Sequence, residues 1–378
     1  MKHRPSWWSA GVLAACVSLA ATGAAWGQPT GSQAQARAGD TAAPGADWRP
    51  AERDAEGLGP WRFTLHLEND SALFIPNSPS DRHYTNGTAF SFAWRPRFAE
   101  QAAEAIPRLG GDFGDNPGTA FGVMLGQLIF TPNNIELTVP QPDDRPFAGY
   151  LFVGGHWQRS GEKTLDHVQL DVGVTGPPSL AEPIQEIVHD VFPNSEDPGG
   201  WDNQIESEPT LQLTLRRKWR SNPDAVRFDL AGLPMQVQGI AGAELDLGTV
   251  LRQLEGTLLA RVGYRLPDDF GPGRLSEPAS FTANPARGWS FYLFGRLTGR
   301  LVEHNLFLEG SDFRNPDHPT VTKNPFVGEA AAGLAVNYAR GGWSVGLNYA
   351  QVYSMQEFEQ QSDNHSYGRY SLSLQREF

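Results

Sequence analysis

The sequence contains a single cysteine and has no long apolar run beyond its N-terminal segment. Only Cys16, among 378 residues, carries a thiol. A folded part that begins later in the chain therefore has neither disulfides nor cysteine chemistry. No stretch of about 18 apolar residues occurs after that segment, which excludes a membrane-spanning helix there. Any crossing of a membrane must then be made by strands.

Positive charge is also scarce. The chain has 30 Lys and Arg residues against 43 Asp and Glu residues, which gives a formal net charge of −13. A nucleic-acid partner is not expected for such an acidic chain without a basic stripe. The acidic excess suits the binding of divalent cations, and it equally suits soluble loops.

The N-terminus has the features of an export signal. Lys2 and Arg4 precede an apolar segment over 7–25 that ends in small residues, which predicts a signal peptide over residues 1–27. Its removal would take the net charge from −13 to −15. A lipidated cysteine is the alternative, because Leu-Ala-Ala-Cys at 13–16 resembles a bacterial lipoprotein box, although the apolar run continues beyond it.

Two further regions follow the signal. Residues 28–58 are rich in Ala, Gly, Pro and charge without periodicity, which predicts a disordered leader. Residues 59–378 form one domain in which polar and apolar residues alternate. The end of the chain, 370–378, alternates up to a terminal Phe378 and is interrupted only at Arg376. This ending is typical of the last strand of an outer-membrane β-barrel, and a soluble periplasmic β-protein is the alternative.

Twelve segments of the domain have the alternation of strands, and bacterial outer-membrane barrels use even numbers of strands. We therefore predict an all-β fold, a transmembrane antiparallel β-barrel of about twelve strands. The candidate strands are 61–69, 87–96, 119–130, 148–159, 164–175, 207–219, 225–246 (interrupted), 248–265, 288–303, 326–340, 342–353 and 366–378.

One segment has the periodicity of a helix instead. Ser179-Leu-Ala-Glu182 has the pattern of a capping box, and Pro183 follows it. Gln185 and His189 lie on the polar side of the predicted helix. A short amphipathic helix in an extracellular loop is unusual for a plain pore and indicates a site. The apolar residues of this helix are Ile184, Ile187, Val188 and Val191.

Two clusters, at the end of the first predicted strand and at the start of the second, contain polar groups that could bind a metal or take part in catalysis. Glu68-Asn69-Asp70 offers hard oxygen ligands for Ca²⁺, or is simply a polar strand end. Residues 81–87, Asp-Arg-His-Tyr-Thr-Asn-Gly, contain the turn signal Asn-Gly, and Thr85 could present its hydroxyl at the barrel rim.

Other motifs are weaker. Asp144-Arg145 before Pro146 is expected to fix a loop through charge-assisted hydrogen bonds. His189 is either a surface histidine or a general base. Gly-Trp-Ser-Val-Gly at 342–346 matches the serine-hydrolase pattern, but it lies in an alternating strand with no helix after it, so we interpret it as chance.

In this order and on this barrel, the clusters resemble the outer-membrane lipid A 3′-O-deacylase family. The resemblance is densest over residues 61–206, and the later strands match mainly in pattern. The motifs that carry it are Glu68-Asn69-Asp70, Asp81-Arg82 with Tyr84-Thr85-Asn86-Gly87, Asp144-Arg145-Pro146-Phe147-Ala148-Gly149, and Gly176-Pro177 followed by Gln185 and His189.

The resemblance implies a site between the barrel wall and a helix of an extracellular loop. It also implies Ca²⁺-dependent hydrolysis of the ester that holds the 3′ acyl chains on lipid A, the lipid part of lipopolysaccharide. Asn69, Asp70, Thr85 and His189 match the family's active-site positions. Asp70 and Glu196 are the implied metal ligands, with Ser195 as the alternative match to the second. A monomer in the outer membrane is expected.

Two points stay open in the sequence. A lysine that the family pattern places shortly after Phe-Thr-Pro is missing, because residues 133–137 read Asn-Asn-Ile-Glu-Leu. Asn69 and Asp70 also lie on opposite faces of a regular strand, so one site can use both only where the strand bends, bulges or ends. The alternative functions are a channel plugged by loop 179–206, or another outer-membrane lipid enzyme of the phospholipase or palmitoyl transferase type.

Overall fold

A computed structural model of the chain describes residues 60–70, 83–114, 117–191, 197–278, 280–281, 287–311, 313 and 320–377. They belong to one compact unit, Leu58–Glu377. The predicted signal peptide, the predicted leader and Cys16 lie outside these residues. None of the helices in the described part of the chain is long and apolar enough to cross a membrane.

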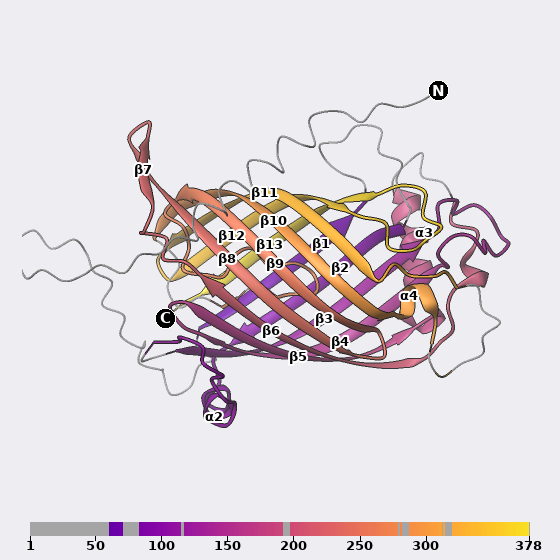
Figure 1. Cartoon of the computed structure of the whole chain (residues 1–378), viewed down its shortest axis with the longest axis horizontal. Coiled ribbons are helices and arrows are strands. Elements are labelled where there is room, and N and C mark those ends of the chain that lie inside the picture. Colours follow the sequence, from indigo (N-terminus) through magenta and orange to yellow (C-terminus); the bar gives the residue numbers. More distant parts are fainter. Residues whose placement is uncertain are drawn as a thin grey trace, which may run out of the picture. The chain divides into compact units, whose positions relative to one another are not determined.

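Twelve antiparallel strands of the described residues close into a barrel (Figure 1). Pairing of β1 with β13 and of β6 with β8 completes the ring. A short strand, β7 (Arg227–Leu230), pairs with β8 as a hairpin, which explains the interrupted pattern over 225–246. The strands of the ring are β1 (Trp61–Asn69), β2 (His83–Trp94), β3 (Gly118–Thr131), β4 (Ala148–Ser160), β5 (Thr164–Thr175), β6 (Pro209–Arg220), β8 (Leu233–Gly248), β9 (Leu251–Tyr264), β10 (Gly288–Asn305), β11 (Phe326–Arg340), β12 (Trp343–Ser354) and β13 (His365–Arg376).

The outer wall is apolar and has aromatic rings near one end. The ring centroid of Trp61 lies 5.8 Å from that of Phe92 and 5.8 Å from that of Trp343. Arg376, which interrupts the alternation of the last strand, places its guanidinium 4.6 Å over the Trp343 ring. An apolar band with an aromatic girdle is the surface that outer-membrane barrels present to lipid. The predicted transmembrane barrel is confirmed.

Residues 266–278 and 280–281 of the connection from β9 to β10, named segment 266–281, lie in the lumen. Arg274 forms ion pairs with Glu255 and with Glu244, the latter at 3.1 Å. The backbone N–H of Leu275 donates to Glu68 at 3.2 Å. The segment that fills the lumen is therefore 266–281, and not the loop 179–206 on which the channel alternative depends.

Short helices lie in the connections. α2 (Arg97–Ala105) follows β2, and α4 (Leu306–Glu309) follows β10. The connection from β5 to β6 contains α3 (Ala181–Val191) between the 3₁₀ turns η1 (Pro177–Ser179) and η2 (Trp201–Asn203). α3 and α4 lie at one end of the barrel, and α2 and β7 lie at the other (Figure 1). Longer loops are typical of the extracellular end of such barrels.

Candidate functional site

Three of the predicted site residues meet where β1 ends. The side-chain amide nitrogen of Asn69 donates a hydrogen bond to the backbone carbonyl of Thr85 at 3.2 Å. The backbone N–H of Asp70 donates to the same carbonyl, also at 3.2 Å. Asp70 is buried, with 1% of its surface exposed. The structure therefore brings together Asn69, Asp70 and Thr85, three of the residues that the resemblance implies.

A β-bulge directs Thr85 to the outer wall. The β2–β3 register shifts between Tyr84 and Asn86, so Thr85 is an extra residue in β2. Tyr84 lines the lumen, whereas the Oγ1 of Thr85 lies 2.6 Å from the Oγ1 of Thr131 on β3. Asp70 follows the last paired residue of β1, beyond which strand alternation no longer applies. The chain therefore departs from regular strand geometry at both positions, as the use of Asn69 and Asp70 in one site requires.

Two expectations for this region are wrong. Glu68 does not join the Ca²⁺ candidate cluster, because it faces the lumen and accepts a hydrogen bond from Arg369 Nε at 2.7 Å. Asn86-Gly87 is not a turn, because both residues lie within β2 and pair with β1. Gly87 is needed there because a β-carbon would overlap the Tyr84 side chain. Asp81 and Arg82 lie outside the described residues.

The start of α3 differs from the predicted capping box. Ser179 ends the 3₁₀ turn η1, and its hydroxyl donates to the Gly176 carbonyl at 2.6 Å. Leu180 has a left-handed backbone, with φ of 59°, and α3 begins one residue later. Consecutive prolines at 177 and 178 remove backbone donors and favour a tight turn before the helix.

α3 begins directly against the outer wall of the barrel. Gly149, which pairs with the outward Ile129, permits this approach because a β-carbon there would overlap the hydroxyl of Ser179 and the methyl of Ala181. The Gln127 amide donates to the Ser179 carbonyl at 2.8 Å. An apolar cluster beneath the helix comprises Ile129, Ile135, Phe147, Ala181 and Trp201.

On α3 the polar side is buried and the apolar side is exposed, the reverse of an amphipathic helix on a soluble protein. Gln185, predicted on the polar side, is buried, and its Oε1 accepts a hydrogen bond from Trp201 Nε1 at 3.0 Å. His189 is partly exposed in the last turn. The apolar side chains project outward instead. Their exposed fractions are 52% for Leu180, 40% for Ile184, 62% for Ile187 and 40% for Val188.

β3 connects the helix to the hydroxyl pair. Gln127, Ile129 and Thr131 alternate along its outer face. Gln127 donates to Ser179, Ile129 belongs to the apolar cluster that contains Ala181, and Thr131 contacts Thr85. Thr131 is a functional candidate that was not predicted from the sequence. It belongs to the Phe-Thr-Pro motif, but its partner Thr85 reaches it only because of the bulge in β2, which the sequence does not reveal. Glu196 and its alternative Ser195 lie outside the described residues.

Acidic groups surround the start of α3. Partial burial raises the pKa of the Glu182 carboxyl, and the nearby carboxylates of Glu186 and Asp202 raise it further. Each added negative charge makes ionisation of the first more costly. This end of the helix therefore carries a negative potential that attracts cations.

The loop before β4 supplies no cation to the outer wall. Arg145 Nη1 pairs with Glu357 at 3.1 Å, and its guanidinium lies 4.5 Å over the lumenal ring of Phe130. Burial lowers the pKa of Arg145, and Glu357 opposes that shift. Asp144 accepts backbone hydrogen bonds from Asn133 at 2.7 Å and from Arg145 at 2.8 Å. The predicted structural role of the pair is confirmed, with these partners.

The chain is similar to known outer-membrane proteins. The profile of the family described as Outer membrane protein LpxR matches residues 31–376. LpxR from Salmonella typhimurium is similar in structure, with a TM-score of 0.63 and 19% identity over 84% of this chain and 100% of that chain. No curated protein matches in sequence.

Two other barrels align more weakly. The β domain of the Bordetella autotransporter BrkA gives a TM-score of 0.36 at 13% identity, over 85% of this chain and 99% of that chain. The translocator domain of NalP from Neisseria meningitidis gives 0.34 at 10% identity, over 86% and 90%. Neither score supports a common fold. By contrast, the family match spans most of the sequence, so the chain belongs to the LpxR family of the outer membrane, the lipid A deacylase family that its motifs resemble.

Proposed function

We propose that this protein is a hydrolase that removes the 3′-linked acyl chains of lipid A in the outer membrane. The observation that carries the proposal is the inverted helix α3, whose apolar side is exposed beside the polar groups of the outer wall. Lipid chains that diffuse in the leaflet can reach this wall sideways, without entering the filled lumen. Membership of the family supports the same substrate class.

In the proposed reaction, His189 is the general base. It takes a proton from a water molecule while the water oxygen attacks the carbonyl carbon of the 3′ ester. The bond from that carbon to the sugar oxygen then breaks, and the proton passes to the sugar oxygen, which leaves a free fatty acid. A serine nucleophile is not needed. Ser344 lies near the start of β12, which continues to Ser354 and provides no strand-to-helix elbow.

The threonine pair is proposed to stabilise the charge that develops on the carbonyl oxygen. When Thr131 donates to Thr85, the proton of the Thr85 hydroxyl is directed to the substrate. Asn69 holds the Thr85 backbone through the 3.2 Å hydrogen bond and so fixes the position of that hydroxyl. One well-placed donor of this kind contributes about 3–4 kcal/mol to transition-state stabilisation.

The residues present fit the Ca²⁺ that the family implies. The Asp70 carboxylate, the Asn69 amide and the threonine hydroxyls are hard oxygen donors of the type Ca²⁺ prefers. We propose Asp70 and Glu196 as its ligands. The described residues contain no cluster of three or more His, Cys, Asp or Glu side chains that could hold a metal, and Glu196 is not among them. When bound, Ca²⁺ would polarise the ester carbonyl as a Lewis acid.

The proposal is tested by incubating the refolded full chain with lipopolysaccharide and Ca²⁺, followed by mass spectrometry of lipid A. Loss of the mass of the 3′ acyl or acyloxyacyl group is expected. A gain of mass by one palmitoyl group, or hydrolysis of phospholipids alone, would indicate another lipid enzyme. An unchanged mass on several lipid A types would contradict the proposal.

A further inference from the structure

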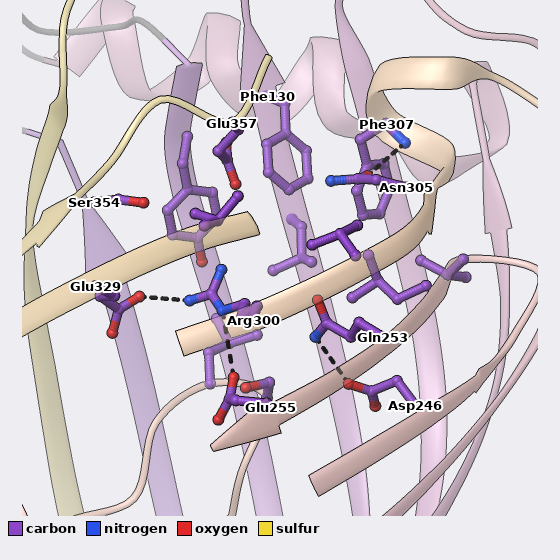
Figure 2. Close-up of a pocket in the computed structure, with 18 of the residues that line it drawn as sticks. Phe130, Asp246, Gln253, Glu255, Arg300, Asn305, Phe307, Glu329, Ser354 and Glu357 are labelled. Carbon is purple, nitrogen blue, oxygen red and sulfur yellow. Dashed lines mark hydrogen bonds and ion pairs between the residues drawn. The ribbon is translucent and has the colours of Figure 1, made fainter. Parts of the chain in front are cut away.

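A cavity lies inside the barrel, on the side of segment 266–281 that faces α4. It has a volume of about 210 Å³, and lumenal side chains from several strands line it (Figure 2). Neither the outward Thr131 nor α3 contributes to its lining. The cavity is therefore separate from the outer-wall site, and its role does not follow from the proposed hydrolysis.

Most carboxylates of this cavity are neutralised by arginines. Arg300 binds Glu329 at 2.6 Å and Glu255 at 3.3 Å (Figure 2). Asp171 and Asp246 differ, because within the described residues no Lys or Arg nitrogen forms an ion pair with either. Leaving two buried carboxylates without a cation is costly.

The two aspartates belong to one polar patch, and strand register places them. Gln169, Thr214, Asp246 and Gln253 pair in a row across β5, β6, β8 and β9. Thr214 Oγ1 donates to Asp246 at 2.6 Å, and the Gln253 amide donates to it at 2.9 Å. Asp171 is the next lumenal residue of β5 after Gln169. Both aspartates are thus held by neutral groups alone.

The same patch contains a buried acceptor that lacks a donor. The Gln169 nitrogen donates to both oxygens of Asp171, at 3.0 and 2.9 Å, which fixes the orientation of the amide. Its Oε1 is buried and has no hydrogen-bond partner among the described residues. Only 3% of Gln169 is exposed. The Arg216 guanidinium attracts both aspartates, but it pairs with Glu244 and forms no ion pair with either. The patch therefore has more acceptors than donors.

Aromatic side chains also line the cavity. Tyr150 stacks on Phe152 with ring centroids 5.0 Å apart, and Phe130 stacks on Phe307 at 4.5 Å. Aromatic faces favour cations and the methylene groups that carry them. A metal ion is less suited, because the described residues gather no three carboxylate, histidine or cysteine ligands at one point.

We propose that this cavity binds a small aliphatic diamine. One ammonium would lie on Asp171 and the Gln169 oxygen, and the other on Asp246, because an ammonium has three donors to satisfy. β5 and β8 are two strand spacings apart, or about 10 Å at the backbone. Side chains that point into the lumen bring their end groups closer together than their backbones. The two carboxylates therefore suit a four-carbon diamine, whose nitrogens are about 6 Å apart.

The test is isothermal titration of the detergent-refolded full chain with 1,4-diaminobutane. Saturable binding of one diamine per chain is expected. The dissociation constant should be at least tenfold higher for Asp171→Asn and for Asp246→Asn. The wild type should also bind butylamine, which has one ammonium, more weakly than the diamine. Asp229→Asn, an exposed change on β7, is the control and should bind as the wild type does. Heat-modifiable migration on gels verifies the folding of each variant.

Three outcomes would overturn the proposal. The first is no saturable binding to the wild type, a result that does not depend on whether a variant folds. The second is equal binding by Asp171→Asn and Asp246→Asn. The third is binding of Ca²⁺ but not of diamine, with loss of Ca²⁺ binding in these variants, which would make the cavity a metal site.

Discussion

The Oγ1 atoms of Thr85 and Thr131 lie 2.6 Å apart on neighbouring strands of the barrel. This contact exists because a bulge places an extra residue in β2 and directs the first threonine outward. It adds a hydroxyl pair to the few polar groups of the outer wall beside α3. The proposed catalysis depends on this contact.

The contact predicts the effect of Thr131→Val. Valine has nearly the same shape and cannot orient the Thr85 hydroxyl, so kcat for lipid A hydrolysis should fall about tenfold, which corresponds to the roughly 1–1.5 kcal/mol of one hydrogen bond. KM should change little. The measurement is initial rates of fatty-acid release at several substrate concentrations.

Thr119→Val is the matched control, because Thr119 lies on the same face of β3 near its other end. Its kinetics should equal those of the wild type. Wild-type rates for Thr131→Val would show that the hydroxyl pair is only structural.

Gly149→Ala should detach the start of α3 from the wall. The added methyl would overlap Ser179 and Ala181, so the helix must move while the barrel still closes. We expect at least a tenfold loss of activity with normal heat-modifiable migration. Gly155→Ala is the control on the same strand and face, where the nearest atom would be an ordinary 3.6 Å away. Equal activity of the two variants would contradict the role given to the seating of the helix.

Alternation along the sequence was sufficient to predict most of the barrel. The strands over 164–175 and 326–340 have the predicted bounds, because one face of each meets lipid and the other meets the polar lumen. The start of β2 was placed four residues late, at 87 instead of His83, because Asn-Gly is a turn signal that pairing with two neighbouring strands overrides.

The site was predictable in composition but not in geometry. Asn69, Asp70 and Thr85 belong to motifs that can be recognised in the sequence. The outward direction of the Thr85 side chain, however, depends on a shift of the β2–β3 register, which no local sequence pattern predicts. The burial of Gln185 depends likewise on Trp201, sixteen residues away. Segment 266–281 has no periodicity, and only the charges of the assembled lumen account for its position.

The exposed side of α3 predicts a substrate-delivery defect for Ile187→Gln. Burying an isoleucine against lipid is worth roughly 1.5–3 kcal/mol, so its loss should lower activity on lipopolysaccharide in vesicles about tenfold or more. In detergent micelles the loss should be smaller. Leu293→Gln, an equally exposed apolar position on β10 away from α3, should behave as the wild type in both media. An equal loss for Ile187→Gln in both media would indicate a packing role instead.

Removal of Ca²⁺ should abolish hydrolysis without unfolding the barrel. EDTA is expected to stop fatty-acid release, and added Ca²⁺ should restore it, because Asp70 and Glu196 are proposed to hold the ion near the ester. Asp70→Asn should raise the Ca²⁺ concentration needed for half-maximal activity by at least tenfold. Full activity in EDTA would contradict the proposed metal.

The most direct test compares the wild type with His189→Ala on one lipopolysaccharide preparation, in Ca²⁺, by mass spectrometry of lipid A. The account predicts that the wild type removes the 3′ chain. His189→Ala should be slower by about 10²–10⁴-fold, the contribution of a general base, with normal heat-modifiable migration. Equal loss of the 3′ chain with both proteins would contradict the claim that the outer-wall site beside α3 performs the reaction.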